Sequence, residues 1–180
     1  AGVPAEALQL VTGAGDVGRA LTAADNIAGV IFTGSTQTAQ RINQSLNDHA
    51  QASGELPVFI AETGGQNAMI VDSTALPEQV VKDAVLSAFG SAGQRCSACR
   101  ILCVQDEMAD DLIELLQGNM AELSVGNPLY AATDVGPVID ADAKNGLEAH
   151  IARMDAEPTA TILAQTPMSV SSVVSQEKST

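Results

Sequence analysis

Residues 27–36 read Ile-Ala-Gly-Val-Ile-Phe-Thr-Gly-Ser-Thr, a β-branched apolar run that ends in a glycine and two hydroxyl side chains. Its composition and length predict a short buried strand. Ser35 or Thr36 is placed to cap a helix that follows directly, because a hydroxyl oxygen accepts a hydrogen bond from a first-turn N–H group. The expected inward stripe of that helix is Ala39, Ile42, Leu46 and Ala50. A strand that leads into an amphipathic helix indicates an α/β fold.

The segments on both sides extend this pattern to a βαβαβ unit. Residues 7–11 are apolar and predict a first strand, and residues 16–24 predict the helix after it. Residues 58–61 predict a third strand, and this order implies parallel strands with right-handed crossovers. Residues 13–18 match the dinucleotide pattern G-x-G-x-x-G. No acidic residue follows at the ribose-binding spacing, so a tight glycine turn explains the match equally well.

The second half of the chain alternates strands and helices again. The expected elements are strands at 68–71 and 101–104, helices at 77–89, 106–123 and 141–154, and an extended piece at 135–139. Asp106 is the expected N-cap of the second of these helices. Its expected inward side chains are Met108, Leu112, Leu115, Leu116 and Met120. Beyond residue 154 the pattern dissolves, so we expect the tail to pack poorly.

Charge and composition exclude several classes of protein. The 180 residues carry 8 basic and 22 acidic side chains, for a formal net charge of -14, whereas nucleic-acid binding requires clustered Lys and Arg. No apolar run approaches the ~18 residues of a membrane-spanning helix. We therefore expect neither nucleic acid nor a membrane as a partner of this segment. The chain begins without Met, and we expect it to be an internal piece of a longer protein.

Three cysteines, Cys96, Cys99 and Cys103, lie close together in the sequence. Cys96 belongs to a polar turn beside the cation Arg95, which is a setting typical of reactive thiols. A buried, unreactive cysteine is the simpler alternative for it, and Cys99 and Cys103 are expected in the core. The C-x-x-C spacing also raises a redox or zinc site. A strand follows the motif where a helix would be needed, and both histidines are isolated, so metal and dithiol chemistry are not expected.

Two strand ends carry the other candidate residues. Glu62 ends an apolar strand beside Thr63 and two glycines. It is either an ion-paired structural carboxylate or a general base. Gly64 would let a substrate or cofactor approach the backbone closely. Gly34 and Ser35 stand at the start of a helix, where free N–H groups form either an anion site or simply a capped helix end.

Three segments, in this order, resemble the signatures of the aldehyde dehydrogenase superfamily: residues 32–36, 62–65 and 93–96. The amino-acid sequence of residues 60–72 and 91–98 is similar to the sequences of one branch of that superfamily. This branch is the glutamate-semialdehyde (pyrroline-5-carboxylate) dehydrogenase module of the bifunctional proline utilization A proteins. The resemblance runs from the first residue to about residue 154.

The fold that the resemblance implies is α/β and consists of parts of two domains. Residues 1–61 would be the C-terminal part of a Rossmann-like NAD-binding domain. Residues 62–154 would be the first part of the catalytic α/β domain, which carries the thiol. Residues 155–180 would be a divergent, poorly ordered tail.

The resemblance also implies a role for each candidate residue. Cys96 would attack the aldehyde to form a thiohemiacetal, which passes hydride to NAD and becomes a thioester, and Glu62 would activate the water that hydrolyses it. The Cys96 backbone N–H would be half of the oxyanion hole. The implied cofactor-binding residues are Gly34, Ser35, Thr63 and Gly64. The implied substrate-binding residues are Ser97 and Arg95. No metal is implied.

The implied reaction is NAD-dependent oxidation of L-glutamate γ-semialdehyde to L-glutamate in proline catabolism, in a cytoplasmic, homo-oligomeric parent protein. FAD is implied only for a separate proline dehydrogenase module. The sequence lacks the family's oxyanion asparagine and its nicotinamide-ribose segment, so we expect little activity from the chain alone. Gln66 and Cys99 depart from the usual lysine and aliphatic residue. An aldehyde dehydrogenase for another substrate, or a remnant that keeps only the fold, are the alternatives.

Overall fold

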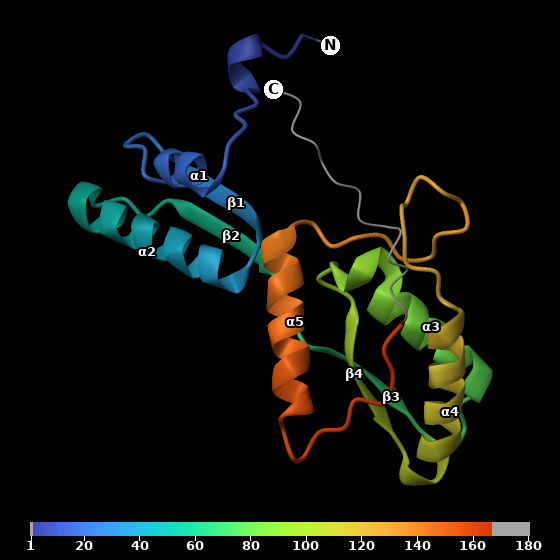
Figure 1. Ribbon diagram of the computed structural model, residues 1–180. Coiled ribbons are helices and arrows are strands. Elements are labelled where there is room, and N and C mark those ends of the chain that lie inside the picture. Colours follow the sequence, from blue (N-terminus) through green and yellow to red (C-terminus); the bar gives the residue numbers. More distant parts are fainter. Residues whose placement is uncertain (1, 167–180) are drawn as a thin grey trace. The chain divides into compact units, whose positions relative to one another are not determined.

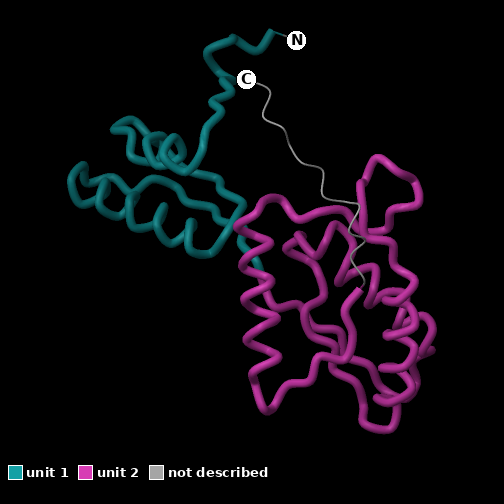
Figure 2. The backbone as a smooth tube through the Cα atoms, viewed as in Figure 1, with its two compact units in different colours: residues 1–64 teal, residues 65–180 magenta. Residues whose placement is uncertain are grey.

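The computed structural model describes residues 2–166, and the chain in it forms two compact units (Figure 1). Unit 1 comprises residues 1–64 and unit 2 comprises residues 65–180 (Figure 2). The division falls close to the domain boundary expected after residue 61. The assignment of the two units to a NAD-binding domain and a catalytic domain stays a prediction.

Unit 1 is built on two parallel strands joined by a helix. Helix α1 (Gly15–Thr22) precedes β1 (Gly29–Gly34), and α2 (Thr36–Ser53) connects β1 to β2 (Val58–Thr63). The strands pair in parallel from Gly29 opposite Val58 to Gly34 opposite Thr63, and α2 packs against both of them. The predicted α/β class and the parallel arrangement of these strands are confirmed.

Helix α2 shows why its sequence folds as it does. The Ser35 hydroxyl accepts a hydrogen bond from the Thr38 N–H at 3.2 Å, which makes Ser35 the N-cap. Gly54 ends the helix with a left-handed φ of 79°, a conformation that glycine adopts without steric cost. Of the predicted stripe, Ala39 and Leu46 are buried. The cap and the inward face are both confirmed.

The strand expected at residues 7–11 is wrong. A single 3₁₀ turn, η1 (Ala5–Ala7), ends where the strand was expected to begin, and residues 8–11 form neither helix nor strand. Their apolar side chains are exposed, Leu8 by 81% and Leu10 by 90%. Strand composition alone does not make a strand, because the backbone groups need a partner strand for their hydrogen bonds. Within the described residues β1 pairs only with β2. The G-x-G-x-x-G match therefore has no preceding strand.

Unit 2 contains a second parallel pair, covered on one face by helices. Strands β3 (Asn67–Val71) and β4 (Cys99–Val104) are joined through α3 (Pro77–Phe89) and the 3₁₀ segment η2 (Gly90–Gly93). Helices α4 (Asp106–Glu122) and α5 (Ala141–Asp155) follow, and α3 and α4 pack side by side (Figure 1). The core residues are Val71, Val81, Val85 and Leu112.

Two details of unit 2 differ from expectation. Asp106 lies in the first turn of α4 and is not its N-cap; Gln105 holds that position without a side-chain cap bond. The Gln105 carboxamide oxygen instead accepts a hydrogen bond from the Ser73 N–H at 2.9 Å. The extended piece expected at 135–139 forms only an isolated bridge, between Val125 and Val135.

The expected burial of Cys99 and Cys103 is also wrong, because Cys99 is half-buried and Cys103 is exposed. Side chains alternate between the two faces of a strand. In β4 the helix-covered face takes Leu102 and Val104, so Cys103 lies on the other face. Its paired residue there, Ile70 in β3, is 83% exposed.

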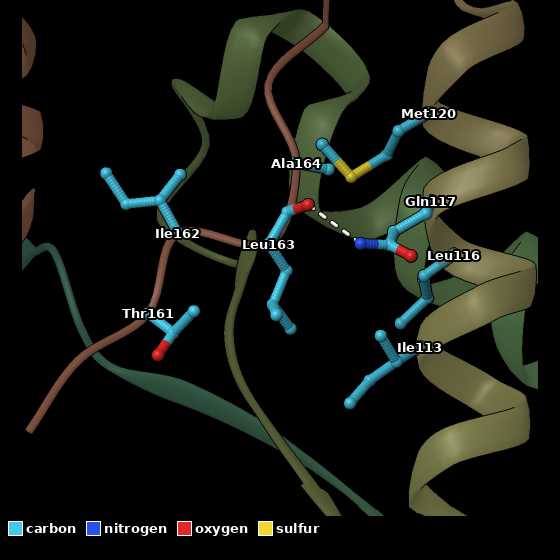
Figure 3. Close-up of a pocket in the computed structure, with 8 residues that line it drawn as sticks. All are labelled: Ile113, Leu116, Gln117, Met120, Thr161, Ile162, Leu163 and Ala164. Atoms are coloured by element: carbon cyan, nitrogen blue, oxygen red, sulfur yellow. Dashed lines mark hydrogen bonds between the residues drawn. The ribbon is translucent and has the colours of Figure 1, made fainter.

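Residues 161–164, which follow α5, lie beside α4 (Figure 3). Leu163 and Ile162 face a shallow pocket on that helix, and the Gln117 carboxamide donates a hydrogen bond to the Leu163 carbonyl at 2.8 Å. The Thr166 hydroxyl donates to the Met120 carbonyl at 3.3 Å. Residues 156–166 thus form contacts without forming a helix or strand, and the rest of the predicted tail lies outside the described residues.

Candidate active site

Four candidate residues of unit 1 share one edge of the β1–β2 sheet. The register places Thr33 opposite Glu62 and Gly34 opposite Thr63, and Ser35 follows β1 directly. These are the carboxyl ends of two parallel strands, which is where ligands bind in open α/β sheets. The Glu62 side chain is exposed there. The structure therefore brings Gly34, Ser35, Glu62 and Thr63 together at an edge that can receive a ligand.

The two glycines at this edge differ in their surroundings. A Cβ atom on Gly34 would lie 2.5 Å from the tip of the Phe32 ring, so a larger residue there would have to displace that ring. No heavy atom lies within 4 Å of a Cβ built on Gly64. The backbone at Gly64 is therefore open to the close approach of a ligand.

A hollow of about 540 Å³ lies between α1, β1 and α2 within unit 1. Apolar side chains, among them Leu21, Ile27 and Ile42, form most of its wall. Arg19 and Arg41 also line it, so cationic groups are available beside an apolar surface. Such a combination suits the flat base and the phosphates of a nucleotide.

Cys96 lies in unit 2, in the turn between η2 and β4, and its thiol is exposed. The turn is closed by the Ala98 N–H, which donates to the Arg95 carbonyl at 3.2 Å. The simpler alternative of a buried, unreactive cysteine does not fit an exposed thiol. Ser97 and Arg95 are exposed beside it, and the Arg95 guanidinium lies next to Gly90.

The backbone before this turn is strained. Ser91, Ala92 and Gly93 adopt left-handed φ values of 57°, 52° and 67° in succession. For a residue other than glycine this conformation costs roughly 1–2 kcal/mol. Backbone strain persists where the surroundings enforce it, and it concentrates at functional sites.

Two polar side chains hold the strained segment in place. The Gln94 carboxamide donates to the Ser91 carbonyl at 3.1 Å and accepts from the Ile139 N–H at 2.7 Å. The Arg100 guanidinium donates to the Gly93 carbonyl at 2.6 Å. Gln94 thereby joins residues 94–98, which we call the nucleophile turn after the role expected of Cys96, to the segment that precedes α5.

Asn67, the first residue of β3, binds the nucleophile turn from the other side. Its carboxamide nitrogen lies 2.6 Å from the Cys96 carbonyl oxygen and 3.0 Å from that of Ala98. Sequence reasoning missed Asn67, and it quoted Gln94 only as part of a motif. The partners lie 29 and 31 residues away in the chain, so no local pattern could have identified them.

The described residues contain no group of three or more His, Cys, Asp or Glu side chains that could hold a metal ion. In that same part of the chain, no helix combines the length and apolar character needed to cross a membrane.

Glu62 belongs to unit 1 and Cys96 to unit 2. Only four residues, Thr63 to Gln66, separate Glu62 from Asn67 in the sequence.

The α/β chain thus carries an exposed thiol on a turn before one parallel strand and an exposed carboxylate at the end of another. The family model of the aldehyde dehydrogenases matches residues 1–171, and the chain belongs to the aldehyde dehydrogenase family. The family expected from the three sequence signatures is thereby confirmed.

The most similar relatives that we compared indicate to which branch of that family the chain is similar. The bifunctional protein PutA of Escherichia coli (strain K12) is 54% identical over 155 residues, which are 86% of this chain and 12% of that protein. A crystal structure of a mutant of Bradyrhizobium japonicum proline utilization A (PutA) matches with a TM-score of 0.88 at 54% identity, over 94% of this chain and 17% of the other.

A third match is the 1-pyrroline-5-carboxylate dehydrogenase from Thermus with bound NAD. It has a TM-score of 0.75 at 31% identity and covers 81% of this chain and 28% of the other. The chain therefore spans about an eighth of the length of the PutA relative from Escherichia coli, and the resemblance to the proline utilization branch is confirmed.

Proposed function

We propose that this chain supplies the nucleophile and the general base for NAD-dependent oxidation of L-glutamate γ-semialdehyde to L-glutamate. The observation that carries the proposal is the exposed Cys96 thiol, on a turn that follows a strained segment and is held by Asn67 and Gln94. The similarity to PutA and to 1-pyrroline-5-carboxylate dehydrogenase supports the choice of substrate. A semialdehyde has one electrophilic carbonyl carbon, which a thiolate attacks readily.

Cys96 performs the covalent chemistry in this proposal. Its thiolate adds to the aldehyde carbon, and the new oxyanion accepts a hydrogen bond from the Cys96 backbone N–H. One such donor contributes about 2.7–4 kcal/mol to the transition state. Loss of hydride from the adduct restores the carbonyl and leaves a thioester on Cys96. The thioester carbon is then open to attack by water.

Glu62 acts on that water. Its carboxylate accepts a proton as the water oxygen bonds to the thioester carbon, and the Cys96 thiolate departs as the carbon–sulfur bond breaks. The products are the γ-carboxylic acid, which ionises to glutamate by releasing the second water proton to solvent, and a regenerated thiolate, with the first water proton on Glu62. General-base assistance of this kind contributes about 10²–10⁴-fold to a rate. Exposure of the Glu62 side chain at a strand end leaves room for the water molecule.

The residues of unit 1 fit a dinucleotide. The hollow lined by Arg19 and Arg41 offers apolar walls and positive charge, and the N-terminus of α2 offers N–H groups beside Gly34 and Ser35. Thr63 and Gly64 lie at the same strand ends. Bound there, NAD would supply the two-electron oxidation. In unit 2, the proposed contacts of the substrate carboxylate are the exposed Arg95 and Ser97.

The proposal is tested in a chimera in which the aligned part of this chain replaces the matching 155 residues of the Escherichia coli PutA protein. We expect NADH formation from the semialdehyde in the parent chimera and none from Cys96→Ser. Glu62→Gln should release about one NADH per active site rapidly and then turn over about 10²–10⁴-fold more slowly, because the thioester accumulates. Absorbance at 340 nm in stopped flow measures both phases.

Two outcomes would contradict the assigned roles. If Cys96→Ser formed NADH as fast as the parent chimera, the assignment of Cys96 as the nucleophile would be wrong. Steady turnover by Glu62→Gln at the parent rate would remove Glu62 as the base. A conservative control is Glu55→Gln, which changes an exposed carboxylate in the loop before β2 and should leave both phases unchanged. A higher kcat/KM for an aldehyde without a carboxylate would overturn the choice of substrate.

A further inference from the structure

We propose that Asn67 is a positioning residue for Cys96, and that its carboxamide sets the conformation in which the thiol reacts. The inference rests on the proposed function, because it assumes that Cys96 is the nucleophile. It assigns to Asn67 a task that no sequence signature suggested. Asn67 touches neither the aldehyde nor the cofactor in this proposal, and it acts only through the backbone of the nucleophile turn.

The geometry of the contact is specific. One carboxamide NH₂ group has two hydrogen atoms, and two carbonyl oxygens lie within reach of it, Cys96 at 2.6 Å and Ala98 at 3.0 Å. The two carbonyls bracket Ser97. With the Cys96 carbonyl held, the backbone ψ angle of Cys96 is fixed, and the direction of its Cβ–Sγ bond is restricted with it.

An irregularity in the pairing of β3 with β4 explains why the Asn67 side chain is needed to bind the backbone of the turn. Asn67 pairs with Cys99, but the next residue, Ala68, pairs with Ile101, so Arg100 is an extra residue in β4. Such bulges interrupt the ladder and redirect side chains near active sites. Arg100 donates to the Gly93 carbonyl. The Asn67 carboxamide and the Arg100 guanidinium thus bind the backbone on both sides of Cys96 from the bulge.

A purely structural role for Asn67 would have different consequences. Ala98 is 2% exposed, and a buried carbonyl without a partner costs about 1–3 kcal/mol. If Asn67 served only the Ala98 carbonyl, its loss would lower stability and leave the reactivity of Cys96 in the folded protein unchanged. A positioning role predicts a selective loss at Cys96, so the two roles can be separated by measurement.

The first test uses the 180-residue chain itself. Cys103 is exposed on β4 in the same molecule and is the internal reference for labelling with iodoacetamide. Parent, Asn67→Ala and Asn67→Asp are compared by mass spectrometry of the labelled peptides. We expect Cys96 to be labelled faster than Cys103 in the parent, and both variants to lower the Cys96-to-Cys103 ratio several-fold. The control Gln66→Ala removes an exposed neighbouring carboxamide and should keep the ratio.

The second test uses the chimera described above. Asn67→Ala should lower kcat by about 10²-fold, the cost of misplacing a reacting group by about 1 Å, while KM for NAD stays within two-fold of the parent value. Hydrogen exchange at the Ala98 amide, which donates to Arg95, should accelerate in the same variant. Far-UV circular dichroism verifies that each variant is folded.

The outcomes separate this inference from the proposed function. An unchanged labelling ratio and unchanged kcat in folded Asn67→Ala would overturn the positioning role, even if stability falls. Equal losses at Cys96 and Cys103 would also overturn it, because they indicate general loosening. Retention of activity by Cys96→Ser would instead refute the proposed function, whatever Asn67 does.

Discussion

At the scale of the residue, conformational cost is concentrated in three positions directly before the nucleophile turn. Ser91 and Ala92 adopt left-handed backbone conformations without being glycine. Gly93 has the same conformation, and a Cβ there would lie 3.0 Å from both the Ala88 carbonyl oxygen and an Arg100 guanidinium nitrogen. The segment that leads into the turn therefore depends on a glycine at position 93 both for its φ and for the space around it.

Gly93→Ala should lower the free energy of unfolding of unit 2 by about 1–3 kcal/mol, because an alanine is strained in this conformation. Gly118→Ala in α4 is the matched control: nothing lies within 4 Å of its Cβ, and alanine is favoured over glycine inside a helix by roughly 0.5–1 kcal/mol. Urea unfolding followed by circular dichroism measures both. Effects of the same sign would refute the claim.

The residues around Cys96 also show how far sequence reasoning reaches. Cys96 and Glu62 were identified from their local setting and their signatures, and the structure leaves both exposed. Asn67 and the bonds of Gln94 could not be identified in this way, because the partners are joined only when β3 pairs with β4 and when residues 137–139 fold back. Signatures mark reacting groups, whereas supporting contacts depend on tertiary structure.

At the scale of the element, the helices follow their apolar stripes closely but not completely. Of the inward residues expected in α4, Leu112 is 1% exposed and belongs to the core, whereas Leu115 is 40% exposed. The predicted inward face included too many residues, because a helix that packs mainly against one neighbour, α3, buries only a narrow face. Position within a helix, not residue type, decides the contribution of each leucine.

Leu112→Ala should therefore destabilise unit 2 by about 2–5 kcal/mol, the range for a buried leucine that leaves a cavity. Leu115→Ala in the same helix deletes the same atoms from a more exposed site and should cost less than about 1 kcal/mol, as side chains away from the core do. Thermal unfolding of the two variants, compared with the parent, gives the difference. Comparable costs would show that the assignment of the core is wrong.

Strands were harder to predict than helices, for a physical reason. The run at 7–11 has strand composition but no partner strand within the described residues, and its leucines are exposed. β1 and β2 were predicted correctly because the two strands pair with each other, and the helix that connects them, α2, packs on both. A helix satisfies its own backbone hydrogen bonds, whereas a strand depends on pairing that local sequence does not encode.

At the scale of the whole molecule, the amount of buried apolar surface is small. Eight aliphatic side chains are buried among the described residues. Each unit has a two-stranded sheet with an apolar residue left open, Ile31 at 82% exposure in β1 and Ile70 at 83% in β3. Sheet faces and edges of this kind tend to associate with other apolar surfaces and strands.

The 180-residue chain should consequently self-associate, and Ile70→Lys should weaken the association because it removes an exposed apolar side chain. Sedimentation velocity over a range of concentrations gives the mass distribution. Gln44→Lys on the exposed face of α2 adds the same charge and is the control. Lysine makes the net charge of -14 less negative, which by itself favours association. Equal effects of the two substitutions would refute the role of the open face.

The bonds of the nucleophile turn set an order of events during synthesis. Asn67 is made 29 residues before Cys96, but the Ile139 N–H that binds Gln94 is made 45 residues after Gln94. While the chain is being translated, the partners of the Asn67 bonds are present once residue 98 has been made, whereas Gln94 cannot bind the Ile139 N–H until residue 139 has left the ribosome. The order of synthesis thus delays the last hydrogen bond of the turn until most of the surrounding polypeptide is available to fold.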